Sequence, residues 1–163
     1  MHPCAARFSP ARVGAEERGQ SQAIALNLRE MACIATPIIA IVIGEGGSGG
    51  ALGVGIADRV CVLENAYYSV ISPEGCAAIL WKDAAMAPEA AEALKLTAQD
   101  LLKAGIIDEV IPEPLGGAHR DPQKTAQNIK ESILKNLKEL KGQDTDTLLK
   151  FRYKKFRSMG VVE

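Results

Sequence analysis

The sequence has 163 residues, with 19 basic and 20 acidic side chains and a formal net charge of −1. This balance gives no overall positive field to attract nucleic acid or an anionic membrane surface. A hydrophobic content of 47% excludes intrinsic disorder. The longest apolar stretch, residues 31–43, is shorter than the roughly 18 residues that a membrane span needs. We therefore expect a soluble protein with one globular domain.

The four cysteines, Cys4, Cys33, Cys61 and Cys76, form no C-x-x-C pair, and no histidine lies at zinc-finger spacing from them. An isolated cysteine among small apolar residues usually acts as a small hydrophobic side chain. We therefore expect reduced thiols, no metal site in this chain and a cytosol-like compartment.

The first part of the chain is predicted to contain a helix, a strand and a glycine-rich turn. The helix runs from Ala15 to the end set by Pro37, with one apolar face that carries Ile24, Leu28, Met31 and Ala35. The β-branched run 38–43 is typical of a strand buried on both faces. Glycines dominate residues 44–50, and small apolar residues follow. Glycine costs a helix about 1 kcal/mol relative to alanine, so this second helix must pack closely on a neighbour.

The next elements continue an α/β order. Strands are predicted at 59–63, 67–71 and 106–111. Helices are predicted to begin at the N-cap residues Ser72 and Thr97, and Gly105 is expected to end the second of them.

The last part of the chain is predicted to be helical. After a loop at 115–120, Asp121 is expected to cap a helix that ends at Gly142. Its predicted apolar face carries Ile129, Ile133, Leu137 and Leu140. The final helix, 145–159, holds five cationic side chains, which we interpret as a solvated face or as a surface for coenzyme A phosphates or a partner subunit.

The glycine-rich turn is the strongest local signal for a site. A strand, a glycine run and a helix start bring several backbone N–H groups together at the positive end of a helix. A phosphate-binding loop would need a lysine after the last glycine, but Ala51 follows Gly50, which argues against nucleotide binding. The turn can instead be an oxyanion hole made of backbone amides alone, or a turn that needs glycine only for close packing.

A serine hydrolase is a further interpretation of the same turn. Residues 46–50 match the nucleophile-elbow pattern G-x-S-x-G, with Ser48 as the nucleophile. The base would be one of the two histidines, oriented by an acid. The candidates for these roles are His2, His119, Asp108 and Asp121.

Four segments then form a recognisable set: 13–20 (VGAEERGQ), 43–51 (IGEGGSGGA), 68–76 (YSVISPEGC) and 111–120 (IPEPLGGAHR). In this order they resemble the carboxyltransferase alpha subunit of the multisubunit, bacterial and plastid type of acetyl-CoA carboxylase. The resemblance runs from Val13 to about Gly160.

The resemblance implies an α/β, crotonase-like (ClpP/crotonase) core of ββα units arranged as a spiral, without its N-terminal strands and with a C-terminal helical tail. It divides the chain into an atypical leader (1–12), a partial carboxyltransferase core (13–114) and a C-terminal helical extension (115–163). The implied reaction transfers a carboxyl group from carboxybiotin to acetyl-CoA and forms malonyl-CoA for fatty acid biosynthesis.

The resemblance also implies partners. Carboxybiotin is presented by the biotin carboxyl carrier protein after biotin carboxylase has acted, and a beta subunit completes an α2β2 heterotetramer. This chain would bind no cofactor directly, and zinc is expected only on the beta subunit. The whole assembly would be an ATP-binding enzyme of the cytoplasm or the plastid stroma.

By the same resemblance, the backbone amides of Gly49 and Gly50 form the oxyanion hole for the biotin carbonyl. The remaining residues of the turn are implied to bind substrate, with Ser48 shaping the loop: Glu45, Gly46, Gly47 and Ser48. His119 and Arg120 are interpreted as loop or subunit-contact residues, and Tyr67 and Tyr68 as strand packing.

Two rival functions remain open at this point. Another crotonase-type acyl-CoA enzyme, such as a decarboxylase or hydratase, would need an acid or base near the turn, for which Glu45 is the candidate. A non-catalytic fragment would only assemble with the beta subunit.

Overall fold

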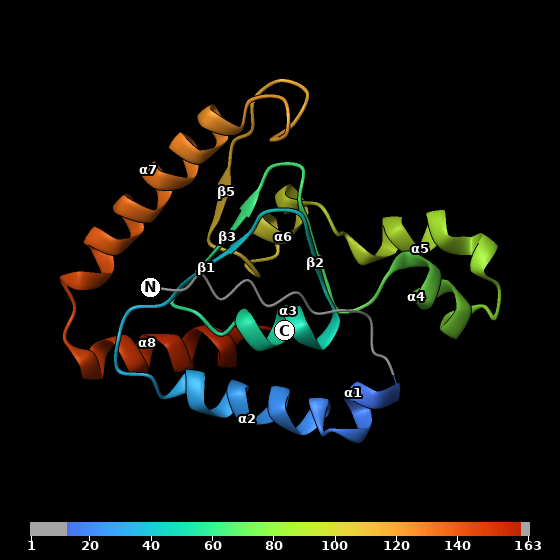
Figure 1. Cartoon of the computed structure of the whole chain (residues 1–163), viewed down its shortest axis with the longest axis horizontal. Helices are drawn as coiled ribbons and strands as arrows, with labels where there is room; N and C mark the ends of the chain where they lie inside the picture. The colour runs from blue at the N-terminus through green and yellow to red at the C-terminus, as the bar shows by residue number, and fades with distance from the viewer. Residues whose placement is uncertain (1–12, 161–163) are drawn as a thin grey trace.

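The computed structural model describes residues 13–160 (Figure 1). The leader 1–12, with His2 and Cys4, lies outside the described residues. The helices are α1 (Val13–Glu17), α2 (Gln20–Ala32), α3 (Ser48–Val54), α4 (Pro73–Leu80), the short 3-10 helix η1 (Ala84–Met86), α5 (Ala87–Leu94), α6 (Ala98–Lys103), α7 (Pro122–Lys141) and α8 (Thr145–Ser158). The strands are β1 (Ile39–Val42), β2 (Glu45–Gly47), β3 (Arg59–Leu63), β4 (Tyr67–Ser69) and β5 (Glu109–Ile111).

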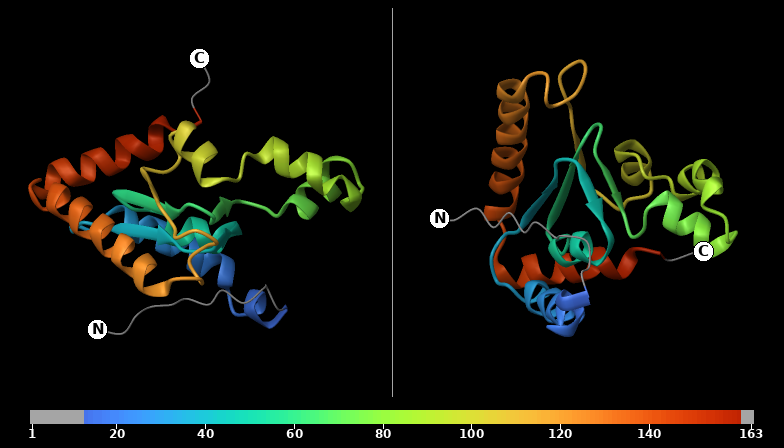
Figure 2. Two further views of the ribbon diagram at one scale, coloured as in Figure 1. Left: turned by 90° about the horizontal axis from the view of Figure 1, so that it is seen from above. Right: turned by 45° about the vertical axis from the view of Figure 1, so that its right-hand side comes forward.

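Two small parallel sheets form the centre of the molecule. One has the strand order β1-β3-β5, and the other pairs β2 with β4. In the first sheet Cys61 lies opposite Ile41 of β1 and opposite Glu109 of β5. Parallel strands require crossover connections, and the intervening helices supply them. Helix α7 packs on the first sheet, whereas α4 and α5 project away from it on the far side (Figures 1 and 2).

The hydrophobic core is centred on β3. Its buried members come from β3, from α6 and from the segments beside them: Ala57, Val60, Cys61, Val62, Leu63, Ala66, Ala98, Leu101, Ile107 and Ile111. The strand predicted at 38–43 forms, but it is half-buried along β1 rather than buried on both faces. The prediction was wrong on this point because β1 lies at the edge of its sheet and all four of its residues border a cavity.

The long N-terminal helix is divided in two and ends early. Gly19, with φ +80°, separates α1 from α2. Helix α2 ends at Ala32 rather than at Pro37, because the carbonyls beyond its last turn accept hydrogen bonds from the guanidinium of Arg152. The predicted apolar face is half-buried at Ile24, Leu28 and Met31, and Ala35 is exposed beyond the helix end.

Arg152 corrects the interpretation of the final helix as a plain basic surface. Its side chain is 1% exposed and pairs with Asp58, which is 3% exposed, at 2.7 Å. It also donates to the carbonyls of Met31, Ile34 and Thr36 at 3.0, 2.8 and 2.9 Å. One turn further, Lys155 pairs with Asp108. Two of the five cations therefore fix α8 against α2 and the sheet, while Lys150, Lys154 and Arg157 are exposed.

The two aspartates occupy equivalent places in the sheet. Asp58 precedes β3 and accepts the N–H of Ile38 at 2.8 Å, and Asp108 precedes β5 and accepts the N–H of Val60 at 2.7 Å. Each carboxylate therefore joins two neighbouring strands at their amino ends. This edge of the sheet is held by ion pairs, which leaves the carboxyl edge for a site, as is usual in open parallel sheets.

Helix α7 buries a more polar face than its sequence predicts. Leu140 is buried, but Ile129, Ile133 and Leu137 are only half-buried, and the other buried side chains are Thr125, Ser132 and Asn136. Asn136 is satisfied there, because its amide donates to the Glu109 carboxylate at 2.7 Å and to the Ser132 carbonyl at 2.9 Å.

Local capping signals are confirmed. The side chains of Ser72, Thr97 and Asp121 accept backbone N–H groups at the starts of α4, α6 and α7. Gly105 follows α6 with φ +69°, a conformation that favours glycine. The three described cysteines are free thiols.

Candidate functional site

The glycine-rich turn lies where β2 leads into α3. Strand β2 pairs in parallel with β4, so that Gly46 lies opposite Tyr68. Helix α3 begins at Ser48, and its N-cap residue Gly47 supplies no side-chain hydrogen bond. The N–H groups of a first helical turn have no partner within the helix. Those of Gly49 and Gly50 therefore have no partner within α3, which is a condition that the predicted oxyanion hole requires.

Close packing of the glycine helix on a neighbour is confirmed. A Cβ on Gly49 would lie 3.7 Å from Ile24 Cδ1, and one on Gly53 would lie 3.5 Å from Ile24 Cγ2. Both glycines therefore face α2, and Gly50 and Gly53 are buried. Packing also explains Gly46 of β2, where a Cβ would lie 3.0 Å from both Tyr68 Cδ2 and Val42 Cγ1, but it does not explain Gly47, where a Cβ would meet no atom within 4 Å.

A cavity of about 860 Å³ lies between the turn and β1. Its apolar wall is formed by the four half-buried residues of β1, and its second wall includes four of the predicted site residues: Glu45, Gly46, Gly47 and Gly50. The other two predicted residues lie elsewhere: Gly49 faces Ile24, and Ser48 lines an apolar cavity of about 290 Å³ on the other side of α3. The structure thus brings most of the predicted turn to one cavity.

Ser48 has some features of a hydrolase nucleophile but no base beside it. It follows a strand, begins a helix and has φ +57°, which is uncommon for a residue other than glycine. However, His119 lines a different cavity from Ser48. Asp108 is paired with Lys155, and Asp121 caps α7. Within the described residues, the triad required of a serine hydrolase is therefore not assembled.

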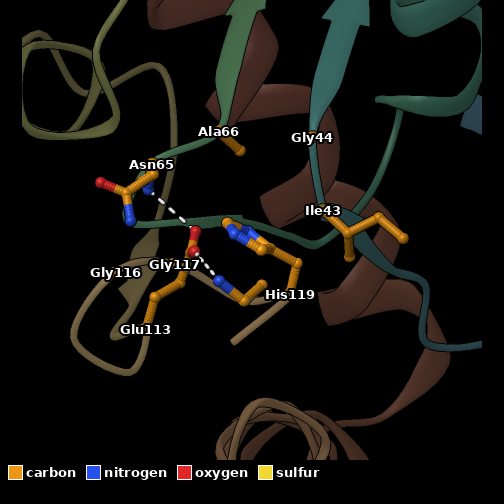
Figure 3. A pocket seen from close by; sticks show the side chains of 9 residues that line it. Ile43, Gly44, Asn65, Ala66, Glu113, Gly116, Gly117 and His119 are labelled. Atoms are coloured by element: carbon orange, nitrogen blue, oxygen red, sulfur yellow. Dashed lines mark hydrogen bonds between the residues drawn. The ribbon is translucent and has the colours of Figure 1, made fainter. Parts of the chain in front are cut away.

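A further cavity, of about 520 Å³, opens at the carboxyl ends of β1, β3 and β5 and shares Ile43 and Gly44 with the larger one (Figure 3). His119, which was interpreted from the sequence as a loop or subunit-contact residue, lines this cavity. Glu113 lies beneath, where its carboxylate accepts the N–H of Asn65 at 2.9 Å and that of Ala118 at 2.6 Å. Glu113 therefore holds the loop that carries His119 against the end of β3.

The hydrogen bonds to Glu113 change its pKa. Partial burial tends to raise the pKa, but the N–H donors of Asn65 and Ala118, with the nearby His119, together hold the pKa of Glu113 below its ordinary value of 4.5. Its carboxylate thus stabilises the native state above the ordinary pKa, and this contribution is lost as the pH falls through the lower native pKa.

We expect Glu113→Gln to lower the free energy of unfolding at pH 7 by about 1 kcal/mol or less, because solvent screens this partly exposed group. The difference from the wild type is expected to shrink as the pH falls below 4.5. Urea unfolding at several pH values measures it, with the exposed Glu92→Gln on α5 as the control. A difference that does not depend on pH would contradict the role of the Glu113 charge.

Tyr68 is the site residue that the sequence analysis missed. It was interpreted as strand packing, yet its hydroxyl donates to the carbonyl of Ala51 in α3 at 3.2 Å. The sequence signals were its place in a short strand that follows the glycine run and its place at the start of the segment 68–76, and neither reveals a contact between residues 17 positions apart.

Other classes of site find no support in the described part of the chain. Among residues 13–160, no group of three His, Cys, Asp or Glu side chains is placed to hold a metal ion. Over the same residues, no helix is both long and apolar enough to cross a membrane.

Comparisons of the sequence identify relatives. Residues 9–160 match the family model described as acetyl co-enzyme A carboxylase carboxyltransferase-like. The acetyl-coenzyme A carboxylase carboxyl transferase subunit alpha of a Thermus thermophilus strain is 57% identical over 149 residues, which is 91% of this chain and 48% of the relative. The subunit of the same name from a Clostridium perfringens strain is 60% identical over 147 residues, which is 90% of this chain and 54% of the relative. The chain therefore spans about half the length of these relatives.

Solved structures share the fold at low sequence identity. A Pseudomonas malonate decarboxylase hetero-tetramer in complex with coenzyme A matches with a TM-score of 0.68 and 18% identity, over 87% of this chain and 56% of that one. The transcarboxylase 12S structure matches with a TM-score of 0.64 and 22% identity, over 82% of this chain and 24% of that one. These similarities confirm the crotonase-type α/β fold. With the family match over residues 9–160, the chain belongs to the family of acetyl-CoA carboxylase carboxyltransferase alpha subunits, of which it corresponds to the C-terminal part.

Proposed function

We propose that this chain provides the carboxybiotin-binding part of an acetyl-CoA carboxylase carboxyltransferase. The reaction is transfer of the carboxyl group from carboxybiotin, presented by a biotin carboxyl carrier protein, to acetyl-CoA. Malonyl-CoA for fatty acid biosynthesis is the product. The names of relatives that share 57% and 60% identity with the chain support this assignment.

The observation that carries the proposal is the uncapped start of α3 beside the large cavity. Gly47 contributes no side-chain cap, and Gly50 lines the cavity together with the glycines of β2. When carboxybiotin loses its carboxyl group, negative charge develops on the ureido oxygen. Fixed backbone N–H donors stabilise such a charge without reorganisation, and each one typically contributes about 2.7–4 kcal/mol to lowering the barrier.

The same geometry explains why the chain needs no nucleophile at the turn. The glycines allow the substrate to approach the backbone closely, and the ureido nitrogen of biotin is the base that we assign for the acetyl methyl group. Glu45 is exposed on β2 and lines the same cavity, so it is placed to contact substrate but is not required as the base.

The proposal includes partners. A beta subunit would supply the acetyl-CoA site in an α2β2 assembly, and biotin carboxylase would load the carrier protein. We place this assembly in the cytoplasm or the plastid stroma. The chain spans only about half the length of its relatives. How much of the reaction it supports therefore also depends on these partners.

A titration with biotin methyl ester tests the site itself, because this probe keeps the ureido ring but has no carboxylate. We expect the amide protons of Gly49 and Gly50 to shift downfield in NMR spectra of the chain as they donate to the ureido oxygen. The amide of Gly142, which ends α7, serves as the remote control. Equal shifts at all three amides, or no shift at Gly49 and Gly50, would contradict the proposed site.

A further inference from the structure

Tyr68 spans the glycine segment from one end to the other. On β4 it lies opposite Gly46, and a Cβ on Gly46 would lie 3.0 Å from Tyr68 Cδ2. At the far end, a Cβ on Gly55 would overlap with the Tyr68 hydroxyl oxygen. Both glycines therefore give room to one aromatic ring, which also separates the large cavity from the apolar cavity beside Ser48.

The hydroxyl of Tyr68 satisfies a carbonyl that the short helix leaves open. The last four carbonyls of a helix have no partner within it, and Ala51 contributes one of these in α3. The N–H of Gly55 bonds to the carbonyl of Leu52 at 3.1 Å. Tyr68 donates to the Ala51 carbonyl instead, at 3.2 Å. Burial raises the pKa of Tyr68 above its ordinary value of 10.0, so the hydroxyl remains a donor at neutral pH.

We propose that Tyr68 is a positioning residue for the backbone donors of the glycine turn. It holds β2 before Gly49 and Gly50 and holds α3 after them, so the direction of their N–H groups is fixed from both sides. This inference rests on the proposed function, because the donors matter only if they receive the charge of the ureido oxygen. Misplacement of a catalytic group by about 1 Å can lower a rate 10²-fold. Contacts of Tyr68 that hold β2 and α3 in place therefore have a large effect on turnover.

Gly55 and Tyr68 are expected to behave as a coupled pair. Gly55→Ala places a Cβ where it overlaps with the Tyr68 hydroxyl oxygen, which forces the ring or the helix to move. In the Tyr68→Phe background this oxygen is absent, and the nearest remaining ring atom, Cζ, lies 3.4 Å from that Cβ. The Ala51 carbonyl oxygen, 3.0 Å from that Cβ, remains in both backgrounds, so the destabilisation caused by Gly55→Ala should be smaller, but not absent, in the Tyr68→Phe background. Equal effects in both backgrounds would contradict the contact on which the proposal depends.

The variant Tyr68→Phe tests the positioning role of Tyr68, and Tyr153→Phe, at a residue that is 69% exposed, is the matched control. Two quantities are measured: the hydrogen exchange of the α3 amides in the chain alone, and kcat and KM in carboxyl transfer with the beta subunit and carboxylated carrier. For Tyr68→Phe we expect exchange about 10-fold faster and kcat about 10-fold lower, with an unchanged KM for acetyl-CoA. The control should change neither.

The two measurements separate this inference from the proposed function. Unchanged exchange in Tyr68→Phe, or faster exchange with unchanged kcat, would overturn the positioning role. If the α3 amides exchange faster in Tyr68→Phe but the wild-type chain supports no carboxyl transfer, the positioning role of Tyr68 is supported and the proposed function is contradicted.

Discussion

Replacing Gly49 by proline is expected to lower kcat for carboxyl transfer by about 10²–10³-fold, the effect of losing one oxyanion-hole donor. Proline has no N–H group, and it is tolerated in the first turn of a helix because that N–H makes no helical bond. Ser48, the residue before it, has φ +57° and does not need the right-handed helical conformation that proline disfavours in its predecessor. The change thus removes a donor without breaking α3.

Gly49→Ala is the matched control for this prediction. It keeps the N–H group, and its Cβ meets Ile24 Cδ1 at 3.7 Å, an ordinary contact distance. We expect kcat within a factor of about 2 of the wild type and equal thermal unfolding temperatures for both variants, since changes that the local packing accommodates have small effects. An equal loss of turnover in both variants would mean that position 49 acts through packing rather than through its N–H group.

Arg152→Met is expected to give the largest loss of stability, about 3–5 kcal/mol, because it leaves Asp58 charged and buried without its partner. Arg152 and Asp58 are both at most 3% exposed and lie 2.7 Å apart. The change also removes the donor from carbonyls that follow α2, at Ile34 and Thr36. Urea unfolding followed by circular dichroism measures the effect.

Two variants on the same helix show whether charge or geometry is responsible. Lys154→Met removes an exposed cation and is expected to change the free energy of unfolding by less than about 0.5 kcal/mol. Arg152→Lys keeps the charge but cannot replace the several N–H donors of the planar guanidinium group, so most of the loss in the free energy of unfolding should remain. A cost below about 1 kcal/mol for Arg152→Met would show that the buried pair does not hold α8 in place.

Features that depend on neighbouring residues were predictable from the sequence. The caps at Ser72, Thr97 and Asp121 follow from side-chain chemistry within one helical turn, and each is present. The glycine run between a strand and a helix likewise indicated close packing, which the contacts of α3 with α2 confirm, whereas the anion site that it also indicated stays a prediction. The order of strands and helices was therefore largely predictable, and the resemblance to a known family gave the fold.

Features that depend on distant pairs were not predictable. Arg152 and Asp58 are separated by 94 positions, and nothing near either residue distinguishes it from an exposed charge. The end of α2 was misplaced for the same reason, since the donor that satisfies its trailing carbonyls lies on α8. Tyr68 and Gly55 meet only because β4 pairs with β2, and single-sequence patterns do not specify that pairing.

The most direct test of the account is malonyl-CoA formation by this chain, mixed with a beta subunit, carboxylated biotin carrier and acetyl-CoA. A full-length relative serves as the positive control. The account predicts malonyl-CoA formation that depends on the chain and is lost in Gly49→Pro but not in Gly49→Ala. A stable complex with the beta subunit that forms no malonyl-CoA, while the full-length relative does, would contradict a catalytic role and leave a chain that only assembles.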